Sequence, residues 1–198
     1  MKPIIGAILL AATLAFAAPA SQAQVFTASL SGPNESPPNA SPGTGSAIVT
    51  LNPLANTMRV QVSFSGLLGT TTASHIHAST PTPFAGTAGV ATTTPTFAGF
   101  PLGVTSGTYD QTLDMTLASS YNPAYVTANG GTPASAEAAL FSAIASGQSY
   151  LNIHTTVVPG GEIRGFLVAT PEPGTIGFLI AMGISGTLLA RRRKPRLS

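Results

Sequence analysis

The chain of 198 residues is poor in charge: only 7% of its residues are Asp, Glu, Lys or Arg. Its formal net charge of +2 comes from bases at the two ends, whereas residues 25–170 are weakly acidic, so nucleic-acid binding is excluded. The chain has no cysteine, which excludes thiol catalysis, disulfides and thiolate metal sites.

The N-terminal segment 1–23 has the organisation of a secretory signal peptide. Lys2 precedes an apolar run over 4–18, and the small residues Ser21 and Ala23 bracket Gln22 just before the expected cleavage point. The run is short for a membrane span, although an uncleaved anchor remains the alternative. We therefore expect the rest of the chain to be exported.

The body alternates between short strand patterns and turns. Segment 58–64 places Met58, Val60, Val62 and Phe64 on one face and polar residues on the other, which predicts a half-buried antiparallel strand. Similar patterns predict strands at 25–30, 46–51, 70–77, 104–117, 149–155 and 162–169, with short strand pieces near 86–92 inside the loop 79–103. Turns at 52–56 and 157–161 predict two hairpins.

Segment 133–146 has the composition of a helix. Thr132 or Ser135 suits its N-cap, and Gly147 follows its last turn. About seven strands with one short helix predict a mainly β fold: an antiparallel immunoglobulin-like or Greek-key β-sandwich or barrel.

The body resembles the CHRD domain, the chordin-type module also found in exported bacterial proteins. The similarity spans 25–169 and rests on the segments Phe26–Gly32 with Glu35, Gly45–Ala47, Ser74–His77, Tyr150–Thr155 and Pro159–Gly165. It implies an immunoglobulin-like sandwich or barrel and brings no established catalytic activity.

The C-terminal segment 171–198 resembles a PEP-CTERM sorting signal. Its parts are the tripeptide Pro171-Glu172-Pro173, an apolar stretch over 174–190 that predicts a transmembrane helix, and a basic cluster formed by Arg191, Arg192 and Arg193. The resemblance implies recognition by an exosortase-type enzyme, removal of the helix, and delivery to the cell surface or extracellular matrix. A single-pass anchor that is never processed is the alternative.

All three histidines of the chain fall on two expected strands. His75 and His77 share a face, and His154 lies on a strand that could neighbour them. Three imidazoles suit Zn or Cu, with Asn152 on the same face and Glu162 as a second-sphere carboxylate. The alternative is that the histidines hydrogen-bond across strands in a polar layer and bind no cofactor.

The His75-x-His77 pair also resembles the copper site of Cu/Zn superoxide dismutase. That family needs further histidines and a disulfide, which this chain lacks, so dismutase chemistry is not expected. Glu162 and Arg164 are expected to form cross-strand ion pairs. Asp110 and Asp114 share a face of a predicted strand but stand well apart. With no Trp and few aromatic residues to hold a sugar, a glycosidase pair is not expected.

These patterns predict a surface-sorted, non-enzymatic β-domain with a structural or adhesive role at the cell surface or in an extracellular polysaccharide matrix. Its partners would be an exosortase, the membrane transiently, and polysaccharide or surface proteins. The alternative is an exported Zn or Cu protein that uses His75, His77 and His154.

Overall fold

The computed structural model describes residues 23–171, so the expected signal peptide, apart from its last residue, and the expected transmembrane helix over 174–190 lie outside the described residues. The strands are β1 (Gln24–Ser31), β2 (Thr44–Asn52), β3 (Thr57–Ser65), β4 (Thr71–Ala78), β5 (Gly107–Asp114), β6 (Ser149–Thr155), β7 (Ile163–Phe166) and β8 (Val168–Ala169). The α-helices are α1 (Pro123–Ala128) and α2 (Pro133–Ala145), and short 3₁₀ turns occupy Gly32–Asn34 and Ala118–Ser120.

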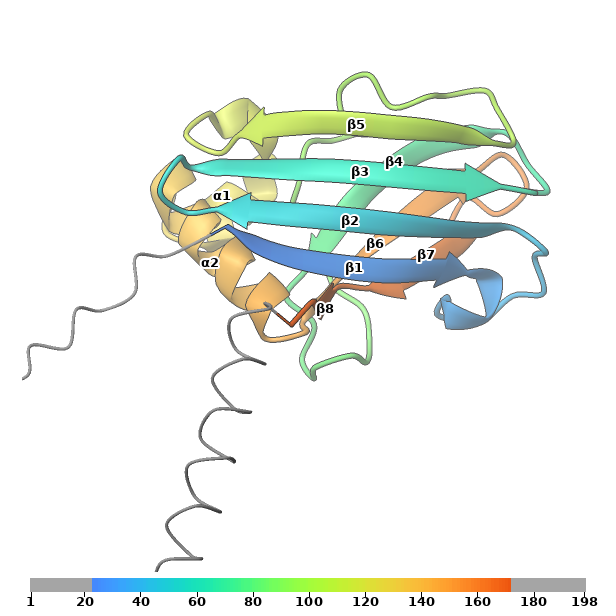
Figure 1. Cartoon of the computed structure of the whole chain (residues 1–198), viewed down its shortest axis with the longest axis horizontal. Coiled ribbons are helices and arrows are strands. Elements are labelled where there is room, and N and C mark those ends of the chain that lie inside the picture. The colour runs from blue at the N-terminus through green and yellow to red at the C-terminus, as the bar shows by residue number, and fades with distance from the viewer. Residues whose placement is uncertain (1–22, 172–198) are drawn as a thin grey trace, which may run out of the picture.

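The strands form one antiparallel sheet in the order β4-β6-β7-β1-β2-β3-β5, with β8 paired to β1. The sheet curls into a half-barrel: β1, β2, β3 and β5 run side by side, while β4, β6 and β7 cross behind them (Figure 1). The prediction of a mainly antiparallel β fold is confirmed. Its two apparent layers belong to one continuous sheet, because β1 pairs with both β2 and β7.

Strand alternation builds the core between the two halves of the curl. Along β3, every second side chain from Met58 to Phe64 is buried, as the sequence pattern predicted. The expected hairpin joins β2 to β3, with Asn52 opposite Thr57 and Asn56 in the left-handed region at φ 51°. Each fully buried Leu, Met or Phe contributes about 1.5–3 kcal/mol to folding, so this layer is a main source of stability.

The predicted helix is present as α2, and it lies with α1 at one end of the curl (Figure 1). Thr132 and Ser135 form a reciprocal capping box, and Gly147 follows with φ +70°. The six-residue helix α1 was not predicted. Asn122 caps it by accepting from the Ala124 amide, and Pro123 follows as its first residue, a signal that also fits a turn.

Several element boundaries differ from the predictions. The strand predicted over 104–117 is confined to Gly107–Asp114, and the one predicted over 162–169 is interrupted at Leu167, whose side chain is buried. The pieces expected near 86–92 are single bridges, His77 to Val90 and Thr92 to Tyr121. Within residues 23–171, neither helix has the length and apolarity required to cross a bilayer.

Candidate metal centre

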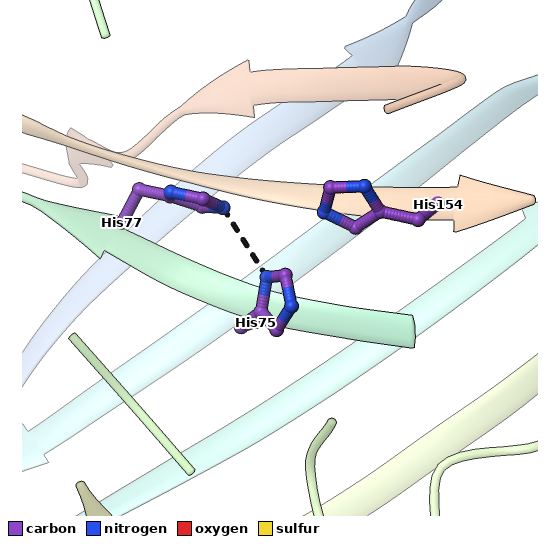
Figure 2. A group of neighbouring side chains, drawn as sticks. All are labelled: His75, His77 and His154. Atoms are coloured by element: carbon purple, nitrogen blue, oxygen red, sulfur yellow. Dashed lines mark hydrogen bonds between the residues drawn. The ribbon is translucent and has the colours of Figure 1, made fainter. Parts of the chain in front are cut away.

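The pairing of β4 with β6 brings the three histidines together. His75 and His77 leave the same face of β4 because they are two residues apart. Opposite them on β6 lie Asn152 and Tyr150, and His154 follows on the same face, opposite Ala73. Figure 2 shows the rings of His75 and His77 from β4 and of His154 from β6 gathered around one space.

The ring nitrogens are close enough to act on one another. His75 Nδ1 lies 3.2 Å from His77 Nε2, and the ring centroids of His75 and His154 are 4.7 Å apart. One nitrogen from each of the three rings lies within 4.8 Å of those of the other two. The structure therefore places the three histidines together in space, as the sequence analysis predicted.

Two backbone carbonyls orient the rings from outside. His77 Nδ1 lies 2.8 Å from the carbonyl oxygen of Ala88, and His154 Nδ1 lies 2.8 Å from that of Pro159. A carbonyl oxygen can only accept, so each Nδ1 carries the proton and each Nε2 presents a lone pair. Residues 79–103 and 156–161, which are loops, therefore fix the tautomers of two strand histidines.

Burial keeps the cluster uncharged. Desolvation, together with the neighbouring His154 and His77, lowers the pKa of His75 to about 3. Burial also lowers the pKa of His77, although its hydrogen bond to Ala88 opposes the shift, and burial lowers that of His154. Neutral imidazole is the form that coordinates metal ions, so the site holds its histidines in a ligating state.

Tyr150 and Arg164 form a stack of side chains on the ring of His77. Tyr150 lies parallel to His77 with ring centroids 4.7 Å apart, and the Arg164 guanidinium lies 4.6 Å above Tyr150. Arg164 also donates to the Asn34 carbonyl and lies 3.8 Å from the Glu35 carboxylate. The expected partner of Arg164 on a neighbouring strand is thus replaced by Glu35, from the loop after β1.

Glu162 does not serve the histidines, contrary to the expectation of a second-sphere carboxylate. It lies just before β7, is completely buried, and accepts four hydrogen bonds, from the hydroxyls of Ser41 and Thr155 and the amides of Leu68 and Gly69. Burial alone would raise the pKa of Glu162, but these bonds outweigh it and lower the pKa. Its role is to hold two loops against the end of β6.

Asp110 and Asp114 take separate surface roles. Both are exposed: Asp110 binds Arg59 through two hydrogen bonds, and Asp114 accepts from the amide and hydroxyl of Thr116. Each carboxylate therefore has its own partners on the surface: Arg59 for Asp110 and Thr116 for Asp114.

Sequence reasoning missed three parts of this region: Glu35 beside Arg164, Tyr150 against His77, and the carbonyls of Ala88 and Pro159. Glu35 lies in a proline-rich loop without a periodic signal, and a backbone carbonyl has no sequence signature at all. Asn152 was anticipated on the correct face, and its side-chain oxygen lies 3.1 Å from His77 Nε2.

Comparison with known families agrees with the two resemblances found in the sequence. Residues 26–167 match the CHRD domain, and residues 169–194 match the PEP-CTERM protein-sorting motif. Comparison with curated proteins and with solved structures gave no match. The sorting motif makes this an exported, surface-sorted protein that is processed by an exosortase-type system. Because the CHRD match spans residues 26–167, well over half of the chain, the chain belongs to the CHRD domain family.

Proposed function

We propose that the protein is a non-enzymatic structural or adhesive component of an extracellular polysaccharide matrix, and that the outward face of β1, β2, β3 and β5 is its contact surface. The sorting motif supports delivery to the place where such a matrix lies. The exosortase would remove the apolar segment 174–190, expected from the sequence to span the membrane, and release the domain from its membrane intermediate.

The observation that carries this proposal is a row of exposed hydroxyls across four strands. Ser29 pairs with Ser46, Ser46 with Ser63, and Ser63 with Thr108, and all four residues are exposed. Neighbouring strands are about 4.8 Å apart, so the row spans roughly 14 Å. A polysaccharide chain presents hydroxyls at regular intervals along its length, which a straight row of donors and acceptors can follow.

The electrostatics of the face favour a neutral polymer. Next to the row, Arg59 donates to both oxygens of Asp110, at 2.8 and 2.6 Å, and Gln61 donates to the same carboxylate at 3.2 Å. The two opposite charges cancel at short range, so the face neither attracts nor repels a polyanion strongly. A shallow groove of about 360 Å³ includes three residues of the row, and its lining consists of Ser46, Ile48, Gln61, Val62, Ser63, Thr108, Tyr109 and Asp110.

The test compares two triple variants of the full-length protein purified in detergent. S29A/S46A/S63A removes three hydroxyls of the row, and the control T72A/S119A/T127A removes three exposed hydroxyls elsewhere. Co-sedimentation with neutral extracellular polysaccharide should weaken roughly tenfold in the first variant, since three hydrogen bonds worth about 0.5 kcal/mol each are lost. Equal sedimentation of both variants and the parent protein would contradict the proposed surface.

A further inference from the structure

One buried nitrogen in the histidine cluster has no hydrogen-bond partner. His154 Nε2 is shielded from solvent and contacts no donor among the described residues, while its Nδ1–H is held by the Pro159 carbonyl. A buried acceptor without a partner loses its hydration and gains nothing in return, which is unfavourable by about 1–3 kcal/mol. Figure 2 shows the His154 ring with its far nitrogen, Nε2, turned toward His75 and His77.

His77 presents a second lone pair to the same space. The Ala88 carbonyl fixes the proton of His77 on Nδ1, so its Nε2 is an acceptor, 3.2 Å from His75 Nδ1. A proton on His75 Nδ1 can satisfy His77 Nε2. That proton cannot also reach His154, so the two Nε2 lone pairs of His77 and His154 share a single N–H between them.

We propose that His75, His77 and His154 bind one Zn or Cu ion, which acts as a clip between β4 and β6. A cation at the centre satisfies all three nitrogens at once, with the proton of His75 moved to its Nε2. Imidazole nitrogen suits both metals, and the chain offers them no thiolate.

The distances agree with this assignment for one pair and define the movement needed for the third ring. Two nitrogens bound to one tetrahedral zinc at about 2.0–2.1 Å are roughly 3.3 Å apart. The separation of 3.2 Å between His75 Nδ1 and His77 Nε2 already meets that value. The widest separation in the cluster is 4.8 Å, so a side-chain rotation has to bring the nitrogens closer by about 1.5 Å.

The surroundings of the site resemble the outer sphere of a metal centre. A ligating histidine usually donates its second N–H to a carbonyl or carboxylate, and the carbonyls of Ala88 and Pro159 accept such bonds here. Because both carbonyls belong to loops, a bound ion would also restrain residues 79–103 and 156–161. The bound ion would therefore order these two loops in a domain that has no disulfide.

The rival explanation is a polar layer without metal. Asn152 lies 3.1 Å from His77 Nε2, and its amide could turn to donate there. That arrangement satisfies His77 and leaves His154 Nε2 unpartnered. His154→Ala therefore separates the two explanations, because it removes one ligand of the proposed metal site. His154 is only half-buried and is not part of the hydrophobic core.

The experiment uses the full-length protein in detergent, stripped with a chelator and then titrated separately with ZnCl2 and CuSO4. We expect one equivalent of one of the metals per chain, a raised melting temperature, and nitrogen splitting in the electron paramagnetic resonance spectrum of a Cu(II) complex. His154→Ala should weaken binding by roughly 100-fold or more, a loss at least as large as that from disturbing an outer-sphere partner. Asp114→Asn, which alters an exposed carboxylate, should bind as the parent protein does.

Two results would overturn the site. One is the absence of stoichiometric binding in both titrations, which assigns the histidines to a polar layer. The other is equal binding by the parent protein and His154→Ala, which places the metal elsewhere. Should His154→Ala fail to fold, His154→Gln preserves side-chain volume, and the same two results apply to it. Both outcomes are independent of polysaccharide binding by the outward face.

Discussion

Replacing Glu162 by glutamine tests whether its carboxylate holds the loops. The buried carboxylate accepts from Ser41 and Leu68 at 2.6 Å through one oxygen, and from Thr155 at 2.6 Å and Gly69 at 3.2 Å through the other. An amide keeps one oxygen and turns an NH₂ group toward the other two donors. Two bonds to a charged acceptor, each worth about 1.5–3 kcal/mol, are then lost or weakened.

We therefore expect E162Q to lower the free energy of unfolding by about 3–6 kcal/mol, a large part of the stability of a domain this size. The assay is urea unfolding followed by far-ultraviolet circular dichroism, because the chain has no tryptophan. The control is Asp114→Asn, the same chemical change at an exposed carboxylate that also accepts two hydrogen bonds. We expect the control to stay within about 1 kcal/mol of the parent protein.

The pH dependence supplies a second check on Glu162. Its hydrogen bonds lower its pKa in the folded protein, so its stabilising contribution is present above the unfolded value of 4.5 and is lost as the pH falls below it. The parent protein and E162Q should therefore approach each other in stability at low pH. An E162Q effect below about 1 kcal/mol at neutral pH, indistinguishable from the control, would refute the assigned role.

Three further predictions concern other parts of the chain. Burial raises the pKa of Glu35 from 4.5 to about 7, so the folded form favours the protonated acid and stability falls as the pH rises between these values. Between pH 4 and 8, the free energy of unfolding should therefore fall by about 3 kcal/mol less in E35Q than in the parent protein. Urea unfolding at a series of pH values would disprove this if both proteins showed the same pH dependence. Gly165→Ala should destabilise by about 2 kcal/mol or more in the same assay, because its Cβ would overlap the Ser29 carbonyl; an effect below about 0.5 kcal/mol would contradict this. Deleting 171–198 should abolish surface display measured by antibody labelling of intact cells, whereas unchanged display would contradict the sorting assignment.

The histidine site shows how far sequence reasoning reached. The spacing of His75 and His77 on an alternating strand determines that their side chains share a face, because the period of a strand is two. The sequence also offered His154 on a second strand. It could not determine that β4 and β6 pair in the register that sets His75 opposite Asn152, since a shift of one residue would turn His154 to the other face.

Glu162 shows the opposite case. Its position at the start of the last expected strand suggested a link to the histidines, and the structure joins it instead to Ser41, which is 121 residues away in the chain. Contacts of this kind depend on how loops close across the curled sheet, and no local pattern records that closure. The same holds for Arg164 and Glu35, which meet only because β7 pairs with the end of β1.

By itself, the sequence determined the features that depend on local order: the alternation of the strands, the hairpin β2–β3, the cap of α2, the CHRD resemblance and the C-terminal sorting motif. The tertiary structure alone decided which polar groups meet: three histidine rings around one space, and four donors on one buried carboxylate. The physical reason is that alternation and capping act within a few residues, whereas strand register and loop closure act between segments far apart in the chain.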